Sequence, residues 1–263
     1  MTIKIAVNAA SGKMGQQVIH QVAANNQTEL TAAFCRVGHR LLGRKVGFQD
    51  IVYSSDFDSG LSGSEVVIDF SLPEATFPLL DAAVKNNTPL LIGTTGFNSE
   101  QTEKIQNAAK SIPILLAPNT SIGVNSALAL LTQAAKMLGK KADIEIIEAH
   151  HKHKVDAPSG TAIRMGQAIA EAMGEDFDHL KVTDSRFQKC SRNKGEIGMS
   201  VIRAGEIIGE HKVLFALDNE IISIEHKAQN RLCFAEGAVS AAAWLASQQP
   251  GFYTMQDFIS SSH

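Results

Sequence analysis

The alternation of short apolar runs with segments of helical spacing constrains the fold more than any other feature of this sequence. The apolar runs span residues 3–8, 30–35, 66–70, 90–93 and 112–117. Short runs of this kind are typical of buried parallel strands. Apolar positions recur at helical spacing at residues 14–22, a further helical segment covers 98–110, and Pro73 suits the first turn of another helix. The alternation predicts a parallel sheet that helices cover on both faces.

The alternation of strands and helices ends near residue 122, where a long helix with one apolar stripe begins. The elements expected after it are a strand, a helix, three strands and an apolar helix, at residues 142–150, 160–173, 199–204, 207–217, 220–228 and 233–247. Residues 177–197 are polar and broken, so we expect a loop there. The pattern predicts an α+β domain at 122–230. The first domain comprises 1–121 and 231–263, because the last helix is expected to return to it.

Composition narrows the class of protein. The chain has 263 residues, of which 44% are hydrophobic and 19% charged, and its formal charge of -3 offers no field for nucleic acid or an anionic membrane. Its cysteines, Cys35, Cys190 and Cys233, are odd in number and widely spaced, which favours a reducing compartment. No signal peptide or membrane-spanning run of about 20 apolar residues is evident. We therefore expect a cytoplasmic enzyme or binding protein.

The turn after the first apolar run indicates phosphate binding. It carries six candidate residues, Ala9, Ala10, Ser11, Gly12, Lys13 and Met14, followed by Gly15. A helix N-terminus offers N–H groups and a partial positive charge to a pyrophosphate, and glycines allow close backbone approach. Ala9 stands where the usual first glycine would be. A tight strand–helix turn without a ligand is the alternative.

Three further loops follow predicted strands and are candidates for the same dinucleotide. Their residues are Cys35 and Arg36, then Gly93, Thr94 and Thr95, then Ala117, Pro118, Asn119 and Thr120. An arginine after the second strand accommodates a 2′-phosphate, whereas an acidic residue there bonds a free ribose hydroxyl. Ligands of open α/β sheets bind outside the carboxyl ends of the strands, so these loops could line one crevice. A solvated Arg36 and ordinary turn chemistry are the alternatives.

The segment from Glu148 to Thr161 carries the strongest chemical signal. It reads Glu-Ala-His-His-Lys-His-Lys-Val-Asp-Ala-Pro-Ser-Gly-Thr, with only His or Lys at 150–154. Such a run indicates an anion with several oxygens, and histidine exchanges protons near neutral pH. The Ser-Gly-Thr turn before a helix offers a second anion site. The alternatives are a generic basic surface and a zinc site, but a metal-binding His-x-x-x-His helix or nearby cysteine is lacking.

These motifs together resemble the 4-hydroxy-tetrahydrodipicolinate reductase family, also called dihydrodipicolinate reductase. The resemblance extends from about Ile3 to the C-terminal helix and includes residues 93–97, 119–125, 148–161, 203–211 and 226–228. It implies a Rossmann-type cofactor domain, a mixed-sheet domain for substrate binding and tetramerisation, and NADPH or NADH as hydride donor. It also implies that the protein is a homotetramer.

The resemblance assigns roles by position. His150 and Lys154 match the catalytic residues, and His151, Gly160 and Thr161 match substrate-binding positions. No metal is implied. The chain departs from the family pattern at Ala9, at Cys35, where many members have an acidic residue, and at Thr120, where an aromatic residue or methionine is common. These departures bear on cofactor preference, and the absence of a carboxylate at 35 beside Arg36 predicts NADPH binding at least as good as NADH binding.

The expected reaction is hydride transfer to a small cyclic dicarboxylate of the lysine and diaminopimelate pathway, with a proton delivered by an acid and loss of water. Two other functions are compatible with the residues alone. One is a two-domain dehydrogenase for a semialdehyde or an open-chain oxo acid, and the other is a sensor that binds NAD(P)H and an anion without turnover. A catalytic cysteine would mark a thioester-forming aldehyde dehydrogenase, and the three cysteines lie in no suitable context.

Overall fold

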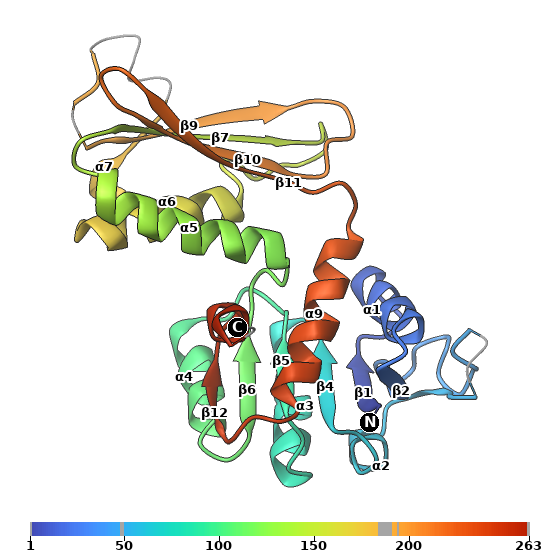
Figure 1. Cartoon of the computed structure of the whole chain (residues 1–263). Coiled ribbons are helices and arrows are strands. Elements are labelled where there is room, and N and C mark those ends of the chain that lie inside the picture. The colour runs from blue at the N-terminus through green and yellow to red at the C-terminus, as the bar shows by residue number, and fades with distance from the viewer. Residues whose placement is uncertain (1, 48–49, 184–190, 194, 262–263) are drawn as a thin grey trace. The chain divides into compact units, whose positions relative to one another are not determined.

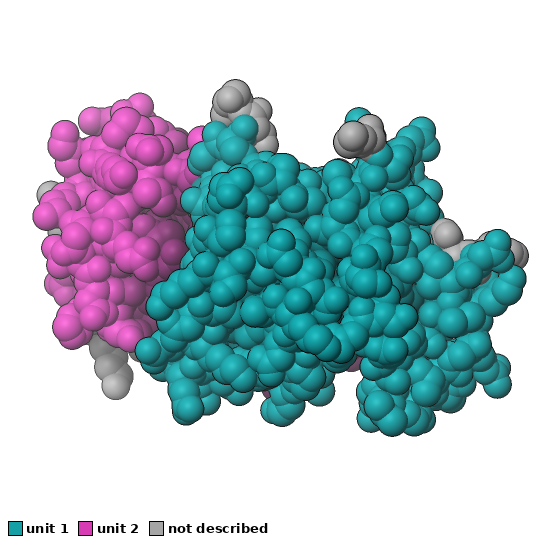
Figure 2. Space-filling view, turned by 90° about the horizontal axis from the view of Figure 1, so that it is seen from below, with its two compact units in different colours: residues 1–122, 232–263 teal, residues 123–231 magenta. Residues whose placement is uncertain are grey.

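The computed structural model describes residues 2–47, 50–183, 191–193 and 195–261. Its contacts divide the chain into two units, coloured separately in Figure 2. Unit 1 comprises Met1–Ile122 and Leu232–His263, and unit 2 comprises Gly123–Arg231. Within the described part of the chain, no helix is long and apolar enough to cross a membrane.

Unit 1 is built on a seven-stranded sheet in the order β12-β6-β5-β4-β1-β2-β3, and every neighbouring pair is parallel (Figure 1). The strands are β1 (Ile3–Asn8), β2 (Thr28–Phe34), β3 (Tyr53–Ser54), β4 (Val66–Asp69), β5 (Leu90–Ile92), β6 (Pro113–Leu116) and β12 (Gly251–Tyr253). The helices are α1 (Lys13–Ala24), α2 (Phe57–Leu61), α3 (Pro73–Lys85), α4 (Ser99–Ala108), α9 (Leu232–Leu245) and α10 (Met255–Ser260). The predicted parallel sheet is thus confirmed.

Successive side chains of each strand point to opposite faces of the sheet, which divides the core of unit 1 into two layers. Ile5 and Val7 of β1 pack with α1, α9 and α10 on one face of the sheet, whereas Ala6 packs with α2, α3 and α4 on the other. The chain runs from β1 outward to β3 and then crosses to β4 on the other side of β1. Ligands of doubly wound sheets bind at such a switch point, beside the carboxyl ends of the two strands.

Unit 2 has a five-stranded sheet in the order β11-β10-β7-β9-β8. Its elements are α5 (Ile122–Leu138), β7 (Asp143–His150), α6 (Gly160–Met173), α7 (Phe177–Leu180), β8 (Lys181–Thr183), β9 (Ile197–Arg203), β10 (Glu210–Ala216) and β11 (Ile221–Lys227). Strands β7, β8 and β9 are parallel, and β10 is antiparallel to both β7 and β11. Helices α5 and α6 cover one face of this mixed sheet (Figure 1), which confirms the predicted α+β character.

The loop expected at 177–197 is wrong for residues 177–183, whereas residues 191–193 and 195–196 lie outside any helix or strand. Helix α7 and strand β8 occupy Phe177–Thr183, and β8 pairs with β9. The reason is tertiary packing, because the Phe177 ring lies against Gly166 of α6, where a Cβ atom would come within 2.2 Å of it. Residues 184–190, with Cys190, and residue 194 lie outside the described residues. Helices α2 and α10 and strands β3 and β12 were not predicted, because they are too short to show periodicity.

Candidate active site

The dinucleotide-binding candidates of unit 1 all follow the carboxyl ends of parallel strands. Residues 9–12 follow β1, residues 35–36 follow β2, residues 93–95 follow β5 and residues 117–120 follow β6. Because the strands are parallel, these loops share one edge of the sheet. This is the edge at which doubly wound folds hold their ligands.

The turn between β1 and α1 has the geometry of an anion cradle. No side chain of the described residues caps the start of α1 at Gly12, so the dipole of its first turn is open to a ligand. A Cβ atom on Gly15 would lie 2.3 Å from the Ala9 carbonyl oxygen, so only glycine permits this close approach. Ala9 itself has a φ of 50°, the left-handed conformation that glycine adopts without cost. The turn therefore keeps the expected shape despite the alanine.

A buried carboxylate that sequence reasoning did not single out lies at the switch point. Asp69, at the end of β4, is fully buried. Its Oδ1 accepts a hydrogen bond from Asn8 Nδ2 at 2.8 Å, and its Oδ2 accepts from the hydroxyls of Thr76 at 2.6 Å and Thr94 at 3.0 Å. Thr94 Oγ1 in turn accepts from the backbone N–H of Ser71. The network fixes one candidate loop to two strands, and a polar residue ending an apolar run was its signal in the sequence.

The other candidates of unit 1 differ in exposure. Arg36 is exposed, whereas Cys35 is 5% exposed and its side chain belongs to the core. Thr120 is also buried, and its hydroxyl donates to the Phe234 carbonyl of α9 at 2.7 Å. A Cβ atom at Gly237 would lie 1.9 Å from the Thr120 carbonyl oxygen, so α9 packs tightly on this loop. The Thr120 side chain therefore holds the loop against α9.

The catalytic candidates of unit 2 gather at the end of β7. His150, its last residue, is buried, and its Nδ1 lies 2.6 Å from Oε2 of the buried Glu148. Lys154 Nζ is 2.8 Å from Asp156 Oδ2, with 22% of the lysine side chain exposed. Gly160 and Thr161 form the first turn of α6, whose positive end attracts anions. The segment thus combines a buried imidazole, a partly exposed ammonium group and a helix N-terminus.

A second histidine completes the cluster. His211 of β10 is paired in register with Glu148, and its Nε2 lies 3.0 Å from the hydroxyl of Ser159, the N-cap residue of α6. The His150 and His211 rings meet edge to face with centroids 5.2 Å apart. The motif at 203–211 contained this residue, but its contact with α6 could not be read from the sequence. His151 and His153 also have neighbouring rings, with centroids 6.2 Å apart.

Burial governs the protonation of these histidines. Burial and, to a smaller extent, the neighbouring His150 lower the pKa of His211 to about 4. Burial also lowers the pKa of His150, and this outweighs the opposing effect of the Glu148 carboxylate. Both imidazoles are therefore neutral at pH 7. Loss of solvent raises the pKa of the Cys35 and Cys233 thiols, which does not suit either of them to act as a thiolate nucleophile.

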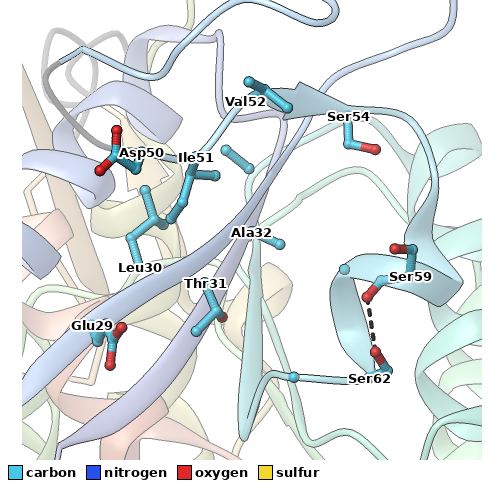
Figure 3. Close-up of a pocket in the computed structure, with 13 residues that line it drawn as sticks. Glu29, Leu30, Thr31, Ala32, Asp50, Ile51, Val52, Ser54, Ser59 and Ser62 are labelled. Atoms are coloured by element: carbon cyan, nitrogen blue, oxygen red, sulfur yellow. Dashed lines mark hydrogen bonds between the residues drawn. The ribbon is translucent and has the colours of Figure 1, made fainter.

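Two other features bear on ligand binding. Among the residues that the structure describes, no three His, Cys, Asp or Glu side chains are grouped to hold a metal ion. A hollow of about 870 Å³ lies beside β2, the segment 50–54 and α2, and Figure 3 shows the residues that line it. None of the candidate site residues lines it.

Comparison with known proteins covers both units. The family model described as "Dihydrodipicolinate reductase, N-terminus" matches residues 3–120, and the one described as "Dihydrodipicolinate reductase, C-terminus" matches residues 123–259. A protein of Syntrophotalea carbinolica is 42% identical over 98% of both chains. One of Alkalilimnicola ehrlichii is 44% identical over 98% of this chain and 99% of its own. Both are named 4-hydroxy-tetrahydrodipicolinate reductase.

Two solved structures resemble this chain over nearly its whole length. The dipicolinate-bound dihydrodipicolinate reductase of Paenisporosarcina sp. TG-14 has a TM-score of 0.81 and 26% identity, covering 97% of this chain and 98% of its own. A myo-inositol dehydrogenase of Corynebacterium glutamicum has a TM-score of 0.61 at 14% identity and covers 99% of this chain and 93% of its own, so it shares the fold. The chain belongs to the dihydrodipicolinate reductase family.

Proposed function

We propose that this protein reduces 4-hydroxy-tetrahydrodipicolinate to tetrahydrodipicolinate with NADPH or NADH, with loss of water, in lysine and diaminopimelate biosynthesis. As a member of the family it is a pyridine-nucleotide-dependent oxidoreductase. The observation that carries the proposal is the arrangement at the end of β7, where the buried His150, the Lys154 ammonium group and the start of α6 belong to one short segment. Such a segment suits a dicarboxylate that must also exchange a proton.

The substrate carboxylates are assigned to His151, Lys154 and the first turn of α6 at Gly160–Thr161. Lysine offers three donors and a compact charge to a carboxylate, and the helix N-terminus adds N–H groups and a partial positive charge. In the structure the lysine contacts Asp156, so a substrate carboxylate replaces an existing anionic partner. The contact with Asp156 orients the lysine before the substrate arrives.

His150 and Lys154 are assigned to the chemical step. Reduction of the substrate ring moves electrons toward its nitrogen, and that nitrogen must receive a proton. A positioned acid accelerates such a transfer roughly 10²–10⁴-fold. Because burial keeps His150 neutral near pH 7, a dianionic substrate next to it would favour the protonated ring. Lys154 then offsets the charge that develops on the substrate.

The dinucleotide is assigned to unit 1. When bound, it supplies the hydride. The open N-terminus of α1, the Gly15 contact and the Asp69-linked loop at Thr94 fit a pyrophosphate and nicotinamide at the switch point. Arg36 is exposed after β2 and is available to a 2′-phosphate, which supports NADPH binding at least as tight as NADH binding. Lys13, also exposed, can reach the phosphates.

The catalytic assignment is tested by His150→Gln and Lys154→Met. Each is expected to lower kcat by roughly 10²-fold or more and to leave NADPH affinity almost unchanged, because the substitutions lie in unit 2. His151→Gln is expected to act more on KM, since lost ground-state binding raises KM and leaves kcat nearly constant.

The same run offers matched controls. Lys152 and His153 have the same side-chain types as the two catalytic candidates, but their side chains are 61% and 69% exposed. Lys152→Met and His153→Gln are therefore expected to keep kcat. If His150→Gln and Lys154→Met both keep kcat within about threefold of the original enzyme, the segment is a carboxylate clamp and the catalytic assignment fails.

The protein is also proposed to be a cytoplasmic homotetramer. The face of the unit 2 sheet opposite α5 and α6 exposes an apolar side chain on β9 and another on β11, namely Ile202 and Ile221. Apolar patches and uncovered sheet edges of this kind are commonly buried by a partner. Light scattering of the whole protein is expected to give the mass of four chains, and a stable monomer at micromolar concentration would contradict the assembly.

A further inference from the structure

Glu148 is the most completely bonded carboxylate of the candidate active site. It lies on β7 with 1% of its surface exposed. Oε1 accepts from the backbone N–H of Ser159 at 2.9 Å and from one guanidinium nitrogen of Arg203 at 2.8 Å. Oε2 accepts from the other guanidinium nitrogen at 2.8 Å and lies 2.6 Å from His150 Nδ1. Strands β7 and β9 and the loop residue Ser159 therefore converge on this side chain.

The carboxylate is ionised in this setting. Burial alone raises the pKa of Glu148, but the hydrogen bonds from Arg203, His150 and Ser159 outweigh burial and hold it below its ordinary value. An ionised carboxylate is an acceptor with no hydrogen of its own. The hydrogen between Glu148 Oε2 and His150 Nδ1 must therefore be on the ring nitrogen. Nε2 of the neutral ring is then the nitrogen that carries the lone pair.

Residue 209, which lies beside Nε2, is a glycine. A Cβ atom at this position would lie 3.2 Å from His150 Nε2 and 3.5 Å from Cδ2 of the same ring. That distance is shorter than side chains normally accept, so even alanine would crowd the nitrogen. The two sides of the imidazole thus differ, with Nδ1 anchored on Glu148 and Nε2 beside a position without a side chain.

We propose that Glu148 is a positioning residue for the reaction: it holds the hydrogen of the His150 ring on Nδ1, so that Nε2, beside Gly209, is the nitrogen that exchanges a proton with the substrate. The proposal rests on the catalytic role proposed above for His150. It follows the general rule that the partner of one imidazole nitrogen sets the state of the other. A purely structural Glu148 would tie Arg203 and α6 to β7 and leave the tautomer of His150 unset.

The direct test is nitrogen NMR of the histidine rings in the whole protein. The chain has nine histidines, and the His150 signals are assigned by their loss in His150→Gln. In the original protein, the neutral His150 ring is expected in the Nδ1–H form. Glu148→Gln is expected to shift the ring toward the Nε2–H form, because an amide offers a donor as well as an acceptor.

Enzyme kinetics give a second measurement, which would not change if Glu148 had only a structural role. In Glu148→Gln, kcat is expected to fall at least about tenfold with KM within about threefold, since orientation serves the chemical step. The midpoint of the pH profile of kcat/KM that belongs to His150 is expected about one pH unit lower, because the anion that favours the protonated ring is gone. Glu148→Asp, which keeps the charge on a shorter side chain, is expected to restore the midpoint more than kcat.

Glu145 supplies a matched control on the same strand. Its carboxylate pairs with Arg192 at 3.0 Å and accepts from the Ser200 hydroxyl at 2.6 Å, and its side chain is 20% exposed. Glu145→Gln therefore removes an arginine-paired carboxylate of β7 that does not contact His150. It is expected to leave the His150 tautomer, kcat and the pH midpoint unchanged.

An Nε2–H ring in the original protein overturns the proposal, and that spectrum is decisive even if Glu148→Gln fails to fold. A folded Glu148→Gln protein with unchanged tautomers and pH midpoint overturns it as well. These outcomes are separate from a failure of the catalytic assignment, which appears as a His150→Gln enzyme that keeps its kcat.

Discussion

The two units each bury a carboxylate at the carboxyl end of a strand beside the candidate site, but they satisfy it in different ways. Asp69 of unit 1 accepts from one amide and two hydroxyls, all neutral. Glu148 of unit 2 accepts hydrogen bonds from both terminal guanidinium nitrogens of Arg203, from Nδ1 of His150 and from the backbone N–H of Ser159. The first network fixes the loop at Thr94, which belongs to the candidate dinucleotide site. The second is part of a charge cluster whose members can change protonation.

The contrast indicates a division of labour. A site built on helix N-termini and glycine turns binds phosphates with little dependence on pH, because backbone N–H groups do not titrate. A site built on buried imidazoles depends on pH, since burial has already moved their pKa values. The following experiments test this contrast, first in unit 2 and then in unit 1.

The largest difference is expected in acid stability. The pKa of His211 is lowered from 6.5 to about 4 by burial and by the nearby His150 and His226, with Glu148 opposing. Between these pH values the unfolded state binds the proton and the folded state does not, so stability falls as pH falls. By pH 4.5 this group alone costs unit 2 roughly 2–3 kcal/mol.

Two probes measure the stability of the two units separately. Amide hydrogen exchange of β7 and β10 reports unit 2, and the fluorescence of Trp244, the single tryptophan, reports unit 1. Protection in β10 is expected to drop between pH 7 and 4.5 in the original protein and to drop less in His211→Gln. An equal drop in both proteins would show that the buried imidazole does not set the acid sensitivity.

A change at Asp69 is expected to have the next largest effect, this time on unit 1. Asp69→Asn puts an amide NH₂ among three donors, so one buried donor loses its acceptor, at a cost of about 2 kcal/mol. Urea unfolding followed by Trp244 fluorescence measures the loss. Asp81→Asn is the control, because that carboxylate of α3 is 71% exposed and lies 3.9 Å from Lys104. Equal stability of the two variants would mean that the Asp69 network is dispensable.

The smallest effect is expected at the exposed Arg36. Arg36→Gln removes a charge-assisted contact with the 2′-phosphate, so the Kd of NADPH is expected to rise about tenfold with the Kd of NADH within about twofold. Fluorescence titration with each dinucleotide gives both constants. Arg40→Gln, another exposed arginine of the same loop, controls for general charge. If both dinucleotides weaken equally in Arg36→Gln, the arginine does not read the 2′-phosphate.

The sequence by itself predicted the elements whose signals are local. Apolar runs and helical periodicity located β1, β4 and α5 to within a few residues, because strand and helix burial repeat along the chain. The His/Lys run at 150–154 was visible for the same reason, since its members are consecutive. Helices and strands that were too short to show periodicity were not predicted. Phe177 lies in one such helix, because its ring packs against Gly166 of α6.

The tertiary structure decided which of these residues act together. Glu148 and Arg203 are 55 positions apart, and Asn8 and Asp69 are 61 positions apart, yet each pair is bonded because neighbouring strands are in register. The sequence supplied the imidazole of His150 and the threonine of the loop at 94. Only the pairing of distant strands brought Arg203 to Glu148 and Asp69 to Asn8, because strand register depends on the whole core and not on any one segment.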